Sequence, residues 1–162
     1  MGCDIHMYVE YKRKEGSYWE SFGTRMNPGR NYKMFSLIAG ARGKSPSSLE
    51  PKGLPPFDDL GYYSTWDAFL MISKGKSEGC CTIEDAKRWK SEIIYRNGEP
   101  AFASHPDWHS HTWLTRKEFL SVIEQYNIES DYEAPTWGAI HAAMNYLEDN
   151  GYETRLVIWF DN

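Results

Sequence analysis

Cysteines and long apolar runs are the scarcest features of this sequence. Only three of its 162 residues are cysteines, and two of them form the adjacent pair Cys80 and Cys81. Neither a disulfide framework nor a Cys-x-x-Cys zinc motif is present, so we interpret the pair as packing residues in a reducing compartment. No apolar run approaches the roughly 20 residues of a membrane helix, and the chain does not begin with a signal-peptide pattern. We therefore expect a cytoplasmic protein without a membrane partner.

Nucleotide-binding motifs and an excess of basic charge are also missing. The sequence contains neither Gly-x-x-x-x-Gly-Lys-Ser/Thr nor Gly-x-Gly-x-x-Gly, so nothing supports a nucleotide triphosphate or a dinucleotide cofactor. The net charge of −5 argues against duplex nucleic acid as a partner, because such binding depends on neutralising phosphates. The segment 21–49 is an exception, since it has five basic residues and no acidic one. It is either an anion-binding region or a basic loop that faces acidic helices.

The two ends of the sequence have the patterns of strands. Ile5, Met7 and Val9 alternate with more polar residues, which predicts a strand at 5–12 with one buried face. The segment 155–162 is apolar with little charge, which is typical of a central strand. Both ends of the chain are therefore expected to belong to a sheet.

Helical spacing and capping residues indicate the remaining elements. We expect three to four helices, at 32–43, 82–91, 115–126 and 135–151. The fold class that follows is α+β, a single domain of residues 1–162 with helices packed on a mostly antiparallel sheet that includes the N- and C-terminal strands. If the terminal strands are neighbours, Asp4 and His6 lie near Asp161.

The strongest chemical signal is the segment 105–111, HPDWHSH, which contains three of the five histidines. Histidine is the side chain best suited to proton transfer near neutral pH and is a common metal ligand. On extended strands, His109 and His111 would point the same way, as would Asp4 and His6. Together these four residues would form either a divalent-metal site or a metal-free catalytic group in which a carboxylate orients an imidazole. The pattern does not choose between these two possibilities.

Other residues fit a phosphate ester. Free backbone N–H groups before the helix at 32–43 favour an anion, arginines make bidentate contacts with phosphate, and tryptophans such as Trp19 stack on bases. The alternative is that the arginines pair with surface carboxylates and that the tryptophans and His141 pack in the core. The candidate ligand-binding residues are Arg25, Arg30, Asn31, Arg42, His105, Asp107, Trp108 and Trp113.

Four blocks of the sequence resemble a family of small phage and bacterial proteins that begin Met-Gly-Cys-Asp-Ile-His. The blocks are MGCDIHMYVEYK, then NPGRNYKMFSLIAGARG with KGLPPFDD, then HPDWHSHTWLT, and finally RLVIWFDN. The resemblance covers nearly the whole chain and implies a phage accessory protein in the host cytoplasm. The motif positions that it implies are Asp4, His6, Arg30, Arg42, Asp107, His109 and His111.

Three functions are compatible with these observations. The first is an anti-defence phosphodiesterase that cleaves a nucleotide immune signal such as a cyclic dinucleotide, with His6, His109 and His111 exchanging protons and Asp4 assisting. The second is a sponge that binds the signal without cleaving it. The third is an inhibitor of a host protein. The density of histidines favours the enzyme, because a site that only grips phosphate would use arginine. A homo-oligomer with shared pockets is compatible with each.

Overall fold

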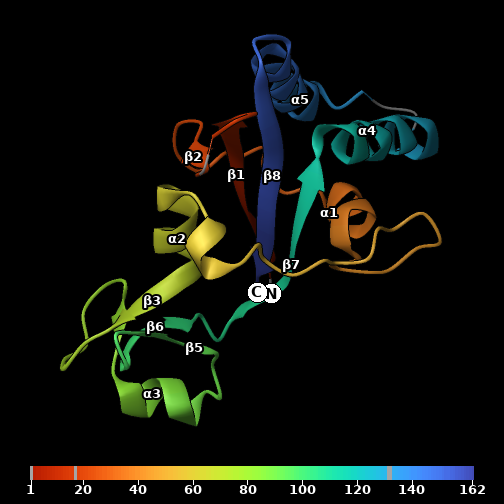
Figure 1. The fold of residues 1–162 in the computed structure, drawn as a ribbon. Coiled ribbons are helices and arrows are strands. Elements are labelled where there is room, and N and C mark those ends of the chain that lie inside the picture. The colour runs from red at the N-terminus through yellow and green to blue at the C-terminus, as the bar shows by residue number, and fades with distance from the viewer. Residues whose placement is uncertain (1, 17, 131–132) are drawn as a thin grey trace.

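Strands β1 (Asp4–Arg13) and β8 (Tyr152–Asp161) form the centre of the fold and pair antiparallel along ten residues. A computed structural model describes residues 2–16, 18–130 and 133–162. In the central sheet β2 (Glu20–Ser21) flanks β1 and β7 (Trp108–Thr115) flanks β8, so the strand order is β2-β1-β8-β7. The two ends of the chain lie side by side at one end of this sheet (Figure 1). The predicted α+β class, with both terminal strands in one antiparallel sheet, is confirmed, and the two strands are also direct neighbours.

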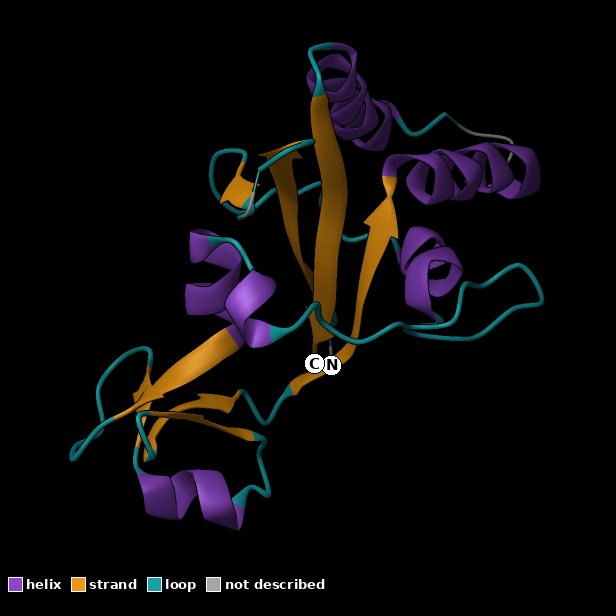
Figure 2. Ribbon diagram, viewed as in Figure 1, coloured by secondary structure: helices purple, strands orange, loops and turns teal. Residues whose placement is uncertain are grey.

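Three helices cover one face of the central sheet (Figure 2). They are α1 (Tyr32–Ala39), α4 (Arg116–Ser130) and α5 (Pro135–Asp149). Alternation along β1 and β8 directs one set of side chains toward these helices, where they form the main apolar core. The sheet contributes Ile5, Met7, Val9, Leu156, Ile158 and Phe160 to this core.

The opposite face of the sheet is buried as well, which the sequence analysis did not expect. His6, Tyr8 and Glu10 on β1 are 4%, 5% and 0% exposed. The covering elements are η1 (Phe57–Asp59) and α2 (Tyr62–Ala68), together with the segment before them. The prediction of a strand with only one buried face was therefore wrong, because a second layer covers its polar side.

A buried ion-pair network fixes α2 on this face. The Glu10 carboxylate accepts hydrogen bonds from the Gly61 amide at 2.7 Å, the Ser64 hydroxyl at 2.6 Å and the Arg155 guanidinium at 2.8 Å. Arg155 also donates to Asp59 at 3.0 Å. A Cβ atom at Gly61 would lie 2.6 Å from the Glu10 carboxylate, so only glycine allows this close approach. We call these five residues the Glu10 network.

A smaller second sheet follows α2 in the chain and has the strand order β4-β3-β6-β5. Its elements are β3 (Phe69–Ile72), β4 (Cys80–Cys81), α3 (Ile83–Arg88), β5 (Ile93–Arg96) and β6 (Glu99–Ser104). Cys81 packs there against Ala86 and Ala103. Among the helices of the described residues, none is both long and apolar enough to cross a bilayer.

Candidate functional site

His6 lies between two carboxylates on the buried polar face of the sheet. Its Nδ1 atom is 2.9 Å from the Asp67 carboxylate and its Nε2 atom is 3.0 Å from the Asp161 carboxylate. The His6 side chain is 5% exposed, whereas those of Asp67 and Asp161 are 27% and 30% exposed. A proton on either ring nitrogen is thus shared with a carboxylate that reaches solvent. This arrangement can relay a proton between two exposed points through a buried imidazole.

Tyr8 completes this group, which we call the acid–base cluster of His6, Tyr8, Asp67 and Asp161. The Tyr8 hydroxyl donates to the Asp67 carboxylate at 2.8 Å. Burial raises the pKa of Asp67, but hydrogen bonds from His6 and Tyr8 outweigh it and hold the pKa below its usual value. Burial and the bond to Asp67 raise the pKa of Tyr8. At neutral pH, Asp67 is therefore ionised and Tyr8 is a neutral donor.

Aromatic rings enclose the imidazole of His6. Trp159 stacks on it at 5.3 Å between ring centroids, and Trp108 contacts it at 4.7 Å. Trp108 also stacks with His105 at 4.4 Å and contacts Trp159 at 5.6 Å. Trp108, expected as a stacking platform for a base, thus already contacts two histidines of the protein.

The segment 109–111 does not present its two histidines on one face. The pairing of β7 with β8 shifts register between His109 and Thr112, and Ser110 has a φ of 52°. His109 stacks with Phe160 on the helix side, whereas His111 stacks with Trp159 on the opposite side. The expectation that His109 and His111 point the same way was wrong, because this bulge reverses the alternation between them.

His111 borders a cavity of about 400 Å³ at the junction of the two sheets, which we call the junction pocket. Its walls include Ala68 and Phe69, which directly follow Asp67, and Ser104, which precedes His105. Burial, with smaller effects from His109 and His6, lowers the pKa of His111 to about 4. Burial also lowers the pKa of His105. Both side chains are therefore neutral proton acceptors at pH 7.

The predicted phosphate ligands make contacts within the protein. Arg30 forms a bidentate pair with Asp4, at 2.5 and 2.9 Å, and Arg25 donates to the Ile5 carbonyl at 2.7 Å. Asn31 caps α1 by accepting from the Met34 amide. Arg42 lies over the Tyr32 ring, and exposed Asp107 donates its backbone amide to His105. Arg25 and Arg30 thus gather at the beginning of β1, close to Asp161.

The expected four-residue metal set does not come together. Asp4 pairs with Arg30, and His109 faces away from His6. In the described part of the chain, no three His, Cys, Asp or Glu side chains are grouped in a way that could hold a metal ion. Among the described residues, therefore, the side chains do not fit a metal centre.

Three members of the acid–base cluster, Tyr8, Asp67 and Asp161, were not among the sequence candidates, although Asp161 was expected near His6. Tyr8 could have been found, because it shares the face of His6 two residues along the strand. Asp67 gave no signal, since its bond to His6 joins residues 61 positions apart. No family model matches this chain, and neither a curated protein nor a solved structure is significantly similar to it. The geometry of the site is therefore what bears on function.

Proposed function

We propose that this protein is a hydrolase that cleaves a phosphoester of a nucleotide signal by acid–base catalysis at the junction of its two sheets. The observation that carries the proposal is His6, buried between two carboxylates that both reach solvent. A structural histidine needs one hydrogen-bond partner to remain in place, whereas two carboxylates create a path for a proton. The neutral ring of His111 supplies a proton acceptor in the adjoining pocket.

Each residue has a distinct role in this proposal. His111 accepts the proton of the attacking water or ribose hydroxyl, and the Asp67–His6–Asp161 relay returns a proton to the leaving oxygen. Arg25 and Arg30 provide positive charge near the exposed edge of Asp161 and offset the repulsion between carboxylates and phosphate. Arg30 can exchange Asp4 for a phosphate oxygen, because both are bound through the same bidentate geometry.

The proposed role in countering bacterial immunity is based on the resemblance to phage proteins. A phage protein that removes a nucleotide immune signal would act in the host cytoplasm against bacterial defence. Cyclic dinucleotides and ADP-ribose derivatives are the substrate classes to test first, because both contain phosphoesters next to aromatic bases.

The test is turnover of these compounds by wild type and by two matched aspartate variants. Asp67→Asn keeps the shape of the side chain but removes the charge that faces His6, so we expect a loss of about 10²- to 10⁴-fold in kcat. Asp58→Asn is the control, because Asp58 is 90% exposed and its ion pair with Arg96 is long, at 3.4 Å. Chromatography of the products gives the rates. If wild type forms no product, the hydrolase is refuted. If Asp67→Asn and Asp58→Asn are equally active, the role of the Asp67–His6–Asp161 relay is refuted.

A sponge is the second candidate, and one observation favours it. Trp19 and Trp113 line a separate pocket that contains no histidine, so a ligand bound there would be held without being cleaved. A sponge would return the intact nucleotide after heat denaturation of the complex. A hydrolase would return its products.

A further inference from the structure

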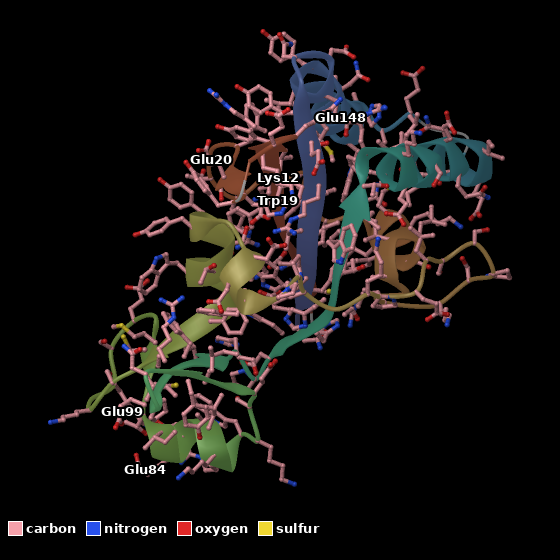
Figure 3. All side chains as sticks on the ribbon, viewed as in Figure 1. Lys12, Trp19, Glu20, Glu84, Glu99 and Glu148 are labelled. Carbon is pink, nitrogen blue, oxygen red and sulfur yellow. The ribbon has the colours of Figure 1, made fainter. Side chains whose placement is uncertain are left out.

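The pocket that contains Trp19 and Trp113 has a volume of about 460 Å³ and lies beside β1, β7 and β8. We call it the aromatic pocket. Lys12 near the end of β1 and Trp19 just before β2 lie next to each other at its edge (Figure 3). The lining residues are Lys12, Trp19, Pro55, Pro56, Asp59, Trp113, Thr115, Glu153, Thr154 and Arg155.

Cations hold both indole rings in place. The Lys52 ammonium lies 3.7 Å from the centre of the Trp113 ring. Trp19 is contacted by Lys12 at 4.8 Å and by Arg155 at 4.0 Å. Arg155 is itself fixed by the Glu10 network, so Trp19 rests against a rigid part of the fold. A ligand that stacks on these rings therefore meets surfaces that are already ordered, which lowers the entropic cost of binding.

The polar groups of this pocket already have partners. The Thr115 hydroxyl donates to Glu118 at 3.1 Å, and the Thr154 hydroxyl donates to Glu148 at 2.7 Å. Apart from its charged groups, the pocket therefore offers flat apolar surfaces from two indoles and two prolines. Such a site selects for a planar ring but has little means to read the edge of that ring.

The position of the pocket relates it to the acid–base site. Trp113 follows His111 by two residues on the same face of β7, since Trp113 pairs with Val157 and His111 stacks with Trp159. Two residues of strand span about 7 Å, which is comparable with the separation of base and phosphate in a nucleotide. Pro55 and Pro56 line both the aromatic pocket and the junction pocket.

From these observations we infer that the aromatic pocket binds the base of a nucleotide by stacking on Trp19 and Trp113, with little discrimination between bases. Lys12 is a cation of this pocket that can turn toward a phosphate, because its pair with Glu153 is long, at 3.5 Å, and Glu153 is 46% exposed. The inference rests on the proposed function only for the choice of a nucleotide as the ligand. Binding itself requires no cleavage.

The test is titration with AMP, GMP and UMP, followed by tryptophan fluorescence and by NMR signals of the indole N–H groups. Trp19→Leu and Trp113→Leu should each weaken binding about tenfold or more, as loss of base stacking does in other proteins. Trp89→Leu is the matched control, because Trp89 also has an arginine near its ring, Arg88 at 5.9 Å, but lies at the end of α3. AMP and GMP should bind within about tenfold of each other.

Binding that is absent in wild type, or equal in Trp19→Leu and Trp89→Leu, overturns the inference. If Trp113→Leu fails to fold, Trp19→Leu still decides, because Trp19 lies just before β2, outside the strands of the sheet. Asp67→Asn separates this inference from the hydrolase. Tight binding of AMP by wild type and Asp67→Asn, with no turnover of cyclic dinucleotides or ADP-ribose derivatives by wild type, keeps the base site and refutes the enzyme. Turnover by Trp19→Leu with an unchanged KM keeps the enzyme and refutes the base site.

Discussion

The two faces of β1 are both buried in the fold but differ in their chemistry. On the helix side, Ile5, Met7 and Val9 pack in an apolar core. On the other side, the same strand presents His6 and Glu10, together with Tyr8, in hydrogen-bonded networks. Burial of the apolar side chains stabilises the fold through the hydrophobic effect, which has no preferred direction. Burial of the polar side chains is tolerated only because each charge has hydrogen-bonding partners. The apolar face therefore contributes most of the stability, and the polar face holds hydrogen-bonding side chains in fixed positions.

The largest effect is expected when a partner is removed from the polar face. Glu10→Ala leaves Arg155 buried without its main counter-ion, so we expect the free energy of unfolding to fall by about 3–5 kcal/mol. Glu153→Ala removes an exposed partner of Lys12 and should cost less than about 1 kcal/mol. Denaturant unfolding of both variants measures this difference. Equal losses would mean that the Glu10 network does not hold the polar face together.

A slightly smaller effect is expected on the apolar face. Leu156→Ala creates a cavity in the main core and should lower the free energy of unfolding by about 3 kcal/mol. Because Leu156 faces away from the acid–base cluster, kcat should remain within about twofold of wild type at a temperature where the variant is folded. Loss of activity in folded Leu156→Ala would show that packing on the apolar face also positions the acid–base cluster.

The smallest effect is a dependence of stability on pH that arises from the polar face. Burial lowers the pKa of His111 from 6.5 to about 4, so the unfolded chain binds more protons than the folded one between these values. The contribution is present above pH 6.5 and is lost as the pH falls toward 4. The full shift would cost about 2 kcal/mol by pH 5, and partial solvent exposure of His111 makes the loss smaller than this.

His111→Gln removes this titration and should flatten the decline in stability between pH 7 and pH 5. His105 and His141 also have lowered pKa values, so a shallower decline should remain in the variant. Thermal unfolding at several pH values compares the two proteins. Parallel curves for wild type and variant would show that His111 is not desolvated in the folded state.

Local signals in the sequence predicted much of the helix side. Thr115 and Glu118 form the expected capping box at the beginning of α4, each accepting a hydrogen bond from the other's backbone amide. Asn31 caps α1 and Thr82 caps α3, as their residue types indicate. Such features depend on residues three or four positions apart, and for that reason the sequence reveals them directly.

The polar side depends on contacts that no local pattern encodes. Alternation along β1 separates one face from the other, but it does not say whether the polar face meets solvent or a second layer of protein. The bulge at Ser110 and the approach of Asp67 to His6 are likewise set by tertiary packing. The bulge turns His109 to the face opposite that of His111, against the prediction. The approach of Asp67 adds to the acid–base cluster a residue that was not a sequence candidate.

The pairing of β1 with β8 has a consequence for the order of folding. The bond between the Asp4 amide and the Asp161 carboxylate joins residues 157 positions apart, and the intervening pairs of the two strands are almost as distant. During synthesis, the ribosome releases β1 long before its partner exists, so β1 must wait with its apolar residues uncovered or held by a chaperone. Contacts of such long range also slow the search for the native topology. We therefore expect the small sheet, whose strands are close in sequence, to be complete before the central one.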